Sequence, residues 1–320
     1  MPRKIKRKIT TREALISVWR KLVVDIDLDV STEPETQGAV RDEDLQRHNV
    51  VRIPFNIEDW NFDENIDERP PVLLEPLAPE VLQMHPMRRE TPIGLRWRSY
   101  IPPSTRDAHD LLQRWGISSC LQRVCNYMEI ILTEPGRLEL PYEESSLLAY
   151  SGLYMIVYPS PYLMFPGMDS CRRGVETWTS LLLLETGDDT GPPTCPHVTM
   201  MVQHDCNGRE DSILYGELAS LVSAMHARAE QPMLEDEEME RAFDEGPGSY
   251  RNKPLVFPRE KRYPVLQLSF IGPQHARVLY ACMDKDRIII CQSKIYSFET
   301  DEEAPSDLFL RIIASKPLTE

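Results

Sequence analysis

The sequence predicts an α+β protein, in which helices and a proline-rich arm precede a mainly antiparallel C-terminal sheet with one long helix. Residues 264–292 contain three apolar runs rich in β-forming residues, separated by the turn sequences GPQH and DKD. Residues 212–232 carry apolar side chains at helical spacing and end at a proline. Eight prolines between positions 70 and 103 interrupt short apolar pieces. Helical patterns and strand patterns thus fall largely in separate parts of the chain, which is typical of the α+β class.

The first twelve residues form a basic tail, because they contain six basic residues and no acidic one. The basic residues are Arg3, Lys4, Lys6, Arg7, Lys8 and Arg12. Such a tail fits nuclear import or contact with nucleic acid, and it equally fits a solvated end of the chain. The whole chain has a net charge of −15, so the remainder is strongly acidic. An acidic body repels phosphate backbones, which leaves only the tail for binding nucleic acid.

Residues 10–26 are predicted to form an amphipathic helix. Thr10 and Glu13 have the spacing of a capping box, and apolar residues then recur at helical intervals. We expect this helix to pack on its own domain. The alternative is that the helix and the basic tail lie together on an anionic membrane surface.

Residues 13–149 are predicted to be helical elements and a proline-rich arm packed on the core, followed by an α+β domain of residues 150–320. Residues 31–103 look mostly loop-like, but their apolar content favours an arm over an unattached linker. Two helices are then expected, over residues 104–116 and 120–132.

Within residues 150–320, short β-forming runs alternate with breaks rich in glycine, proline and aspartate. The runs LYMIVY, TWTSLLLLE and HVTMMVQ come before the long helix and are expected to be strands. The acidic stretch of residues 235–245 is expected to be a solvated loop. The runs PVLQLSFI, ARVLYACM and RIIICQ are predicted to form a three-stranded antiparallel meander with half-buried strands.

His275 and Arg277 are two residues apart on the second strand of this meander, so their side chains point to the same face. Together they would form an anion-binding site. The alternative, which we favour, is an exposed pair at a hairpin end, because GPQH has turn chemistry. A dyad of His275 with Asp284 has poor geometry, since nine residues of strand span ~30 Å, far beyond hydrogen-bond reach.

The stretch CPHVTMMVQHDC contains four plausible metal ligands, Cys195, His197, His204 and Cys206. The segment between the two histidines is predicted to be a strand, which separates them by ~23 Å. Zinc requires all its ligands within ~2.3 Å of one centre. We therefore expect no metal site, and the sequence predicts no cofactor.

The sequence contains no phosphate-binding loop, no G-x-S-x-G elbow, no H-E-x-x-H helix and no H-R-D loop. Strands before and after one helix suggest a restriction-endonuclease-like core, but no lysine follows an acidic residue by two positions. A degenerate form of that fold would place His204, Asp205 and Glu217 at a relict polar site. Otherwise, Glu217 is expected to be exposed on the polar face of its helix.

The seven cysteines are scattered along a long chain, which is typical of reduced thiols in the cytoplasm or nucleus. No secretory signal is visible, because no apolar core follows the basic start. No apolar run approaches the ~20 residues that a membrane-spanning helix needs.

Three stretches resemble a group of uncharacterised proteins of filamentous fungi: GELASLVSAMHARAEQPMLEDEE, PVLQLSFIGPQHARVLYACMDKDRIIICQSKIYSFE and APSDLFLRIIAS. The likeness covers roughly the last 170 residues and consists of apolar runs around a Gly-Pro-x-His turn. It implies a eukaryotic, intracellular origin and a shared C-terminal domain, with no activity attached.

Three functions remain open from the sequence. The first is a non-enzymatic interaction protein that binds a protein partner through its acidic surface or a sheet edge. The second is a divergent nuclease-like or hydrolase fold, whose site would combine two or more of His204, Asp205, Glu217 and His275. The third is a nucleic-acid-associated protein that acts through residues 1–12.

Overall fold

The computed structural model of the chain describes residues 9–60, 72–85, 99–105, 116–133, 146–168, 171–173, 176–187, 193–245, 250 and 252–318. Residues 1–8 of the basic tail and most of the predicted helix 104–116 lie outside these ranges. No helix within the described ranges is long and apolar enough to cross a membrane.

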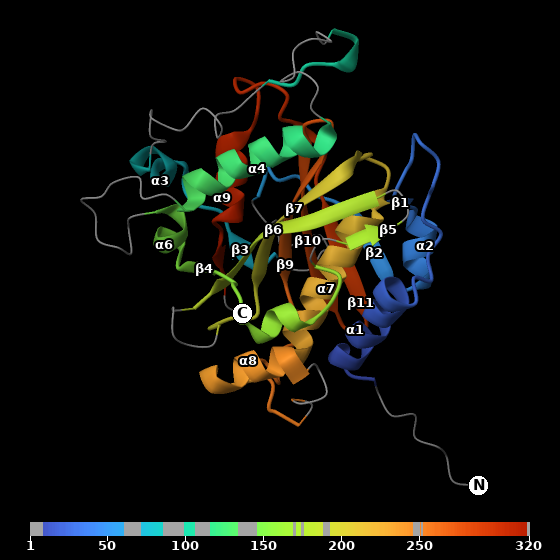
Figure 1. Cartoon of the computed structure of the whole chain (residues 1–320), viewed down its shortest axis with the longest axis vertical. Helices are drawn as coiled ribbons and strands as arrows, with labels where there is room; N and C mark the ends of the chain where they lie inside the picture. The colour runs from blue at the N-terminus through green and yellow to red at the C-terminus, as the bar shows by residue number, and fades with distance from the viewer. Residues whose placement is uncertain are drawn as a thin grey trace.

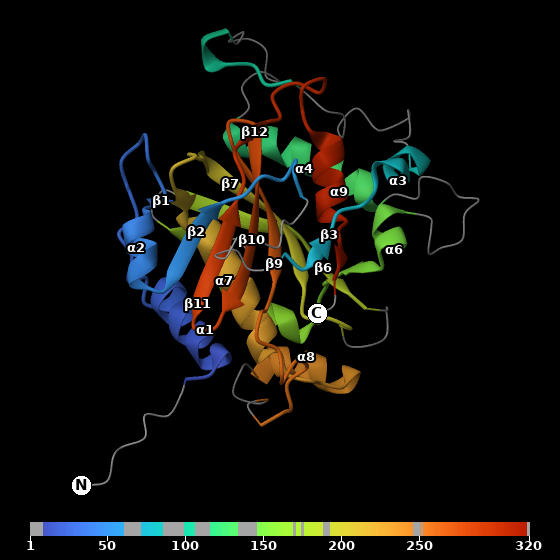
Figure 2. The ribbon, with the colours of Figure 1, turned by 180° about the vertical axis from the view of Figure 1, so that it is seen from behind.

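A nine-stranded mixed sheet forms the centre of the described part of the protein (Figures 1 and 2). Its strands are β2 (Val50–Pro54), β4 (Leu153–Met155), β5 (Cys171–Arg173), β6 (Glu176–Thr186), β7 (Val198–Asn207), β9 (Val265–Gly272), β10 (His275–Asp284), β11 (Arg287–Gln292) and β12 (Tyr296–Ser297). The main path runs β2-β11-β10-β9-β7-β6-β4, while β12 pairs with β10 and β5 with β6. Only the pairs β7–β9 and β11–β2 are parallel among these strands. The predicted α+β class is confirmed.

The predicted meander is also confirmed. Strands β9, β10 and β11 pair antiparallel in sequence order, with Leu268 opposite Val278 and Tyr280 opposite Cys291. The expectation of half-buried strands was wrong, because all eight residues of β9 are buried. Side chains of β9 enter two separate cores, Leu268 in one and Val265 in the other. Helices therefore cover both faces of the sheet.

Helix α7 (Tyr215–Glu230) covers one face. It is the predicted long helix, and its residues from Tyr215 to Ala229 are all buried. Burial extends around the whole helix because α1 (Thr11–Trp19), the π-helical turn η1 (Arg20–Val24) and η5 (Pro161–Met164) pack on it in addition to the sheet. The sequence pattern had assigned only one apolar face to this helix.

Helix α1 begins at the predicted capping box. The Glu13 amide donates to Thr10 Oγ1 at 3.2 Å, and the Thr10 amide donates to Glu13 Oε2 at 2.8 Å. Leu15 and Leu22 are fully buried in the same core as α7. The expectation that this helix packs on its own domain is confirmed.

Within the described residues, four helices cover the opposite face: α3 (Pro79–Met84), α4 (Ile117–Thr133), α6 (Leu147–Ser151) and α9 (Ser306–Ile313). Figure 1 shows them gathered on one side of the sheet, with α1 and α7 on the other. The predicted helix over residues 120–132 is confirmed as α4, and it begins three residues earlier than expected.

The loop-like prediction for residues 31–103 missed several short elements. These are β1 (Ala39–Val40), α2 (Asp42–Arg47), β2, β3 (Leu74–Glu75) and α3. Strand β2 adds a parallel edge strand to the main sheet, β1 pairs with β8 (Ile213–Leu214), and β3 pairs with β13 (Lys316–Pro317). Strands of two to five residues carry little periodic signal, because periodicity needs longer windows.

The acidic stretch of residues 235–245 is a helix, α8 (Asp236–Glu245), and not the expected solvated loop. Ala242 is buried, and the Phe243 ring makes an edge contact with Tyr158, with ring centroids 4.8 Å apart. These two side chains give α8 an apolar side, which its acidic composition obscured.

Candidate functional site

Three of the five predicted site residues meet between helix α7 and the sheet. Glu217 lies in the first turn of α7, Arg277 on β10 and His204 on β7, and each is 0% exposed. The prediction that Glu217 lies on an exposed polar face was wrong, and so was the exposed hairpin-end position of Arg277. Both errors have one cause, since neither α7 nor this part of the sheet has a solvent-facing side.

Glu217 and Arg277 form a buried ion pair. Arg277 Nε donates to Glu217 Oε1 at 2.8 Å, and Arg277 Nη2 donates to Glu217 Oε2. Ser269 Oγ on β9 also donates to Oε1, at 2.6 Å, and the Leu214 amide donates to Oε2 at 2.8 Å. Each carboxylate oxygen therefore accepts two hydrogen bonds from within the protein.

The other side of the Arg277 guanidinium holds the loop that leads into β8 and α7. Its Nη1 donates to the carbonyl oxygens of Arg209 at 2.7 Å and Ser212 at 3.0 Å. An external anion would have to displace these carbonyls or Glu217 in order to bind. Arg277 thus ties together β10, α7 and the 209–212 loop.

Two carboxylates lie at the N-terminus of α7. The Gly216 amide donates to Glu176 Oε1 at 2.8 Å, beside the bond from Leu214 to Glu217. The positive end of the helix dipole stabilises negative charge at this position. A Cβ atom at Gly216 would lie 2.8 Å from both Glu176 Oε1 and His204 Nδ1, so the close approach of these groups requires glycine.

At neutral pH the ion pair is charged, whereas the histidine is neutral. Burial alone would raise the pKa of Glu217, but the Arg277 guanidinium outweighs burial and holds that pKa below its usual value. Burial lowers the pKa of His204 to about 4, although Glu217 pulls it in the other direction. Glu217 is therefore ionised and His204 neutral at pH 7.

His204 is the least satisfied member of the cluster. Both of its ring nitrogens are buried and make no hydrogen bond to any described residue. The ring lies opposite Trp178 in the β6–β7 register, and Trp178 belongs to the core on the α7 side. An enclosed neutral imidazole has no route for exchanging a proton with a substrate.

Asp205 and His275 do not join this cluster. Asp205 Oδ1 accepts a hydrogen bond from the Thr177 amide at 2.7 Å, which ties β7 to β6. His275 is partly buried at the start of β10, opposite Ile271 and Ser297. Burial lowers its pKa, and Glu299 opposes that shift. Neither side chain has an arrangement that suggests catalysis.

Among the described residues, no group of three or more histidine, cysteine, aspartate or glutamate side chains is arranged to hold a metal ion. Strand β7 separates the two ends of the stretch 195–206, which contains the four candidate ligands. At one end, Cys195 Sγ donates to Thr186 Oγ1 at 3.2 Å. At the other end, Cys206 packs against Leu214 and Ile271.

Sequence reasoning missed Glu176, Gly216, Gln267 and Ser269. Ser220 Oγ donates to Gln267 Oε1 at 3.0 Å, so this part of α7 bonds to β9 at two points. One signal was available, because Gln267 and Ser269 are alternate polar residues within the apolar run VLQLSFI. Such a pattern places two polar side chains on one face of a buried strand, where they need partners.

A pocket of about 590 Å³ lies on the other side of the sheet, between α3, α4 and α9. Its lining comes from three distant parts of the sequence, residues 79–85, 127–131 and 305–311. These parts lie far apart in the sequence, so local patterns could not place them together.

The geometry defines the chain as an α+β protein with a two-faced core, a closed ionic cluster and an open pocket on the opposite side. No family model, no curated protein and no solved structure matches it. The likeness of the C-terminal half to filamentous-fungal proteins therefore stays a prediction.

Proposed function

We propose that the protein is a non-enzymatic binding protein, in which the cluster around Glu217 is structural. One observation carries this proposal: the three ionisable residues that the fold brings together are 0% exposed. A catalytic acid or base must come within hydrogen-bond reach of its substrate or of one bridging water. Here the described neighbours enclose all three side chains.

The bonding within the cluster supports the same conclusion. Arg277 and Glu217 are bonded to each other, to Ser269, and to backbone groups of the segment 209–214. These contacts fix the start of α7 on the sheet and hold the loop before it. A cluster of this kind specifies how two elements pack. Binding of a partner then takes place at the protein surface.

We further propose an intracellular location, in the cytoplasm or nucleus. All six cysteines whose side chains the structure describes are free thiols. A reducing compartment would maintain that state.

Diethyl pyrocarbonate, which acylates accessible neutral imidazoles, tests whether the cluster is closed. The extent of modification is measured for each histidine by mass spectrometry at pH 7. The proposal predicts that His204 stays unmodified in the native protein while the partly buried His275 reacts, and that both react in urea. Modification of native His204 at the rate of His275 would show solvent access and would overturn the structural role.

A further inference from the structure

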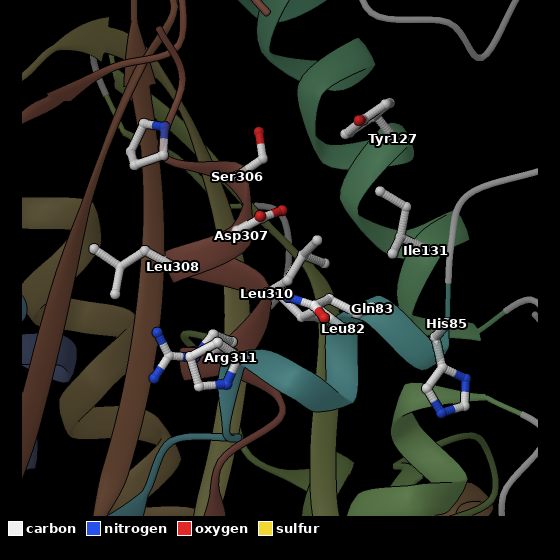
Figure 3. Close-up of a pocket in the computed structure, with 12 residues that line it drawn as sticks. Leu82, Gln83, His85, Tyr127, Ile131, Ser306, Asp307, Leu308, Leu310 and Arg311 are labelled. Carbon is white, nitrogen blue, oxygen red and sulfur yellow. The ribbon is translucent and has the colours of Figure 1, made fainter. Parts of the chain in front are cut away.

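The pocket between α3, α4 and α9 has an apolar floor. Figure 3 shows Leu82 of α3, Ile131 of α4 and Leu310 of α9 lying around it. Leu82 and Ile131 are partly buried and pack against the core on this side of the sheet, of which Leu310 is a member. The pocket has a volume of about 590 Å³, which falls within the range of roughly 300–1,000 Å³ that is common for binding clefts.

One edge of this pocket is acidic. Asp307, in the first turn of α9, is exposed and lies at the pocket, and the run of Asp301, Glu302 and Glu303 just before α9 is exposed as well. Burial raises the pKa of Tyr127 to about 12, and the charges of Asp301 and Asp307 add to that effect. Both carboxylates therefore lie close to Tyr127, which lines the pocket from α4.

Among the described residues that line the pocket, one guanidinium is present, that of Arg311, one helical turn after Asp307 on α9. Arg311 Nε donates to the Leu77 carbonyl, which ties α9 to the arm. The carboxylates of Asp307 and of the 301–303 run outnumber this one positive charge, so the pocket has a net negative edge beside an apolar floor. Negative charge at this edge would repel phosphate groups of nucleic acids and the headgroups of anionic lipids.

We propose that this pocket binds a peptide segment of a partner protein that carries a large apolar side chain next to lysine or arginine. The apolar side chain enters between Leu82, Ile131 and Leu310, and the basic side chains pair with Asp307 and the 301–303 run. This is the chemistry by which helical grooves take apolar anchors from partner segments. The proposal rests on the proposed binding function, and it names the site and the class of partner.

The test uses the full-length protein and a short fluorescein-labelled peptide of leucine and lysine that forms an amphipathic helix. Fluorescence anisotropy gives the dissociation constant. Two variants change the pocket at exposed positions: Gln83→Trp fills it, and Asp307→Lys reverses the charge of its edge. Each is expected to weaken binding by about tenfold or more, which corresponds to about 1.4 kcal/mol. Circular dichroism spectra check that both variants are folded.

Asp244→Lys on α8 is the matched control, because it reverses an exposed carboxylate outside the pocket. It should leave the affinity unchanged. Matched peptides, with glutamate in place of lysine or serine in place of leucine, should bind at least about tenfold more weakly.

Equal affinity for the two pocket variants and the native protein would overturn the pocket as the site while leaving a binding protein. Equal weakening by Asp244→Lys would show attraction by the acidic surface in general and would also overturn it. Absence of binding by the leucine–lysine peptide would overturn the partner class. The binding function itself fails separately, if native His204 is open to diethyl pyrocarbonate.

Discussion

Arg277 and Glu217 show how a single pair of residues fixes the packing of an element. Their contacts join β10, the first turn of α7 and the 209–212 loop, and they do so without access to solvent. Desolvating two charges costs several kcal/mol for each ion, so the pair is stable only because the neighbouring donors and carbonyls complete its hydrogen bonds. Removing any one of these neighbours therefore has a larger effect than its single bond suggests.

Ser269 provides the simplest case at this scale. The change Ser269→Ala removes the hydroxyl that donates to Glu217 Oε1 at 2.6 Å in a buried site. We expect the free energy of unfolding to fall by about 1.5–3 kcal/mol, since this is a hydrogen bond to a charged group. Urea unfolding measures it. Ser119→Ala on the exposed side of α4 is the control and should change stability by less than about 0.5 kcal/mol.

Helix α7 shows what a sequence can and cannot predict about an element. Its length and position followed from apolar residues at helical spacing and from Pro232 at its end. Its burial on every side did not follow, because that depends on α1 and η5, which come from distant parts of the chain. For the same reason, Glu217 looked like an exposed helical glutamate.

The meander and the acidic helix also show that local signals are predictable from the sequence, whereas contacts with distant parts of the chain are not. Strands β9 to β11 were predictable, because the GPQH and DKD turns and the β-forming runs are local signals. Strand β2 was not predictable, because it pairs in the sheet with β11, more than two hundred residues later. Helix α8 was missed because its charged residues outnumber the apolar side chains that pack against the protein, such as Ala242 and Phe243.

The start of α7 gives a prediction at the scale of the element. In the variant Gly216→Ala, the added methyl group would lie 2.8 Å from both Glu176 Oε1 and His204 Nδ1. We expect a loss of about 1–3 kcal/mol in the free energy of unfolding, because buried groups must move apart. Thermal and urea unfolding measure the change.

Gly116→Ala is the matched control for that variant. Apart from its immediate chain neighbours, no atom of the described residues lies within 4 Å of a Cβ at Gly116, which stands just before α4. The change Gly116→Ala should have only a small effect on the free energy of unfolding. If both alanine variants are equally stable, the start of α7 is less tightly packed than these distances indicate.

For the whole molecule, three buried histidines make the fold sensitive to acid. Burial lowers the pKa values of His197, His204 and His226 to about 4 each, from an ordinary value of 6.5. Between these values each imidazole is neutral in the folded chain and protonated in the unfolded one. Stability is therefore lost as the pH falls from 6.5 toward 4, by up to about 1.4 kcal/mol per pH unit for each histidine.

Urea unfolding at a series of pH values measures this dependence. The three histidines together contribute up to about 4 kcal/mol per pH unit to the slope, and His204→Gln should reduce the measured slope by about 1.4. The carboxylate of Glu217 adds to the loss only at lower pH, because its folded pKa is below its usual value of 4.5. A slope that is unchanged in His204→Gln would contradict the neutral, buried state of this residue.

A double-mutant cycle on Glu217→Leu and Arg277→Met tests most directly whether the ionisable cluster under α7 is a closed structural core. Each single variant leaves one buried charge without its partner, so each should lower the free energy of unfolding by about 3–5 kcal/mol. The double variant should lose far less than the sum, with a coupling free energy of at least about 2 kcal/mol. Additive effects, or single variants as stable as the native protein, would show that water reaches both side chains, and the structural account would then be wrong.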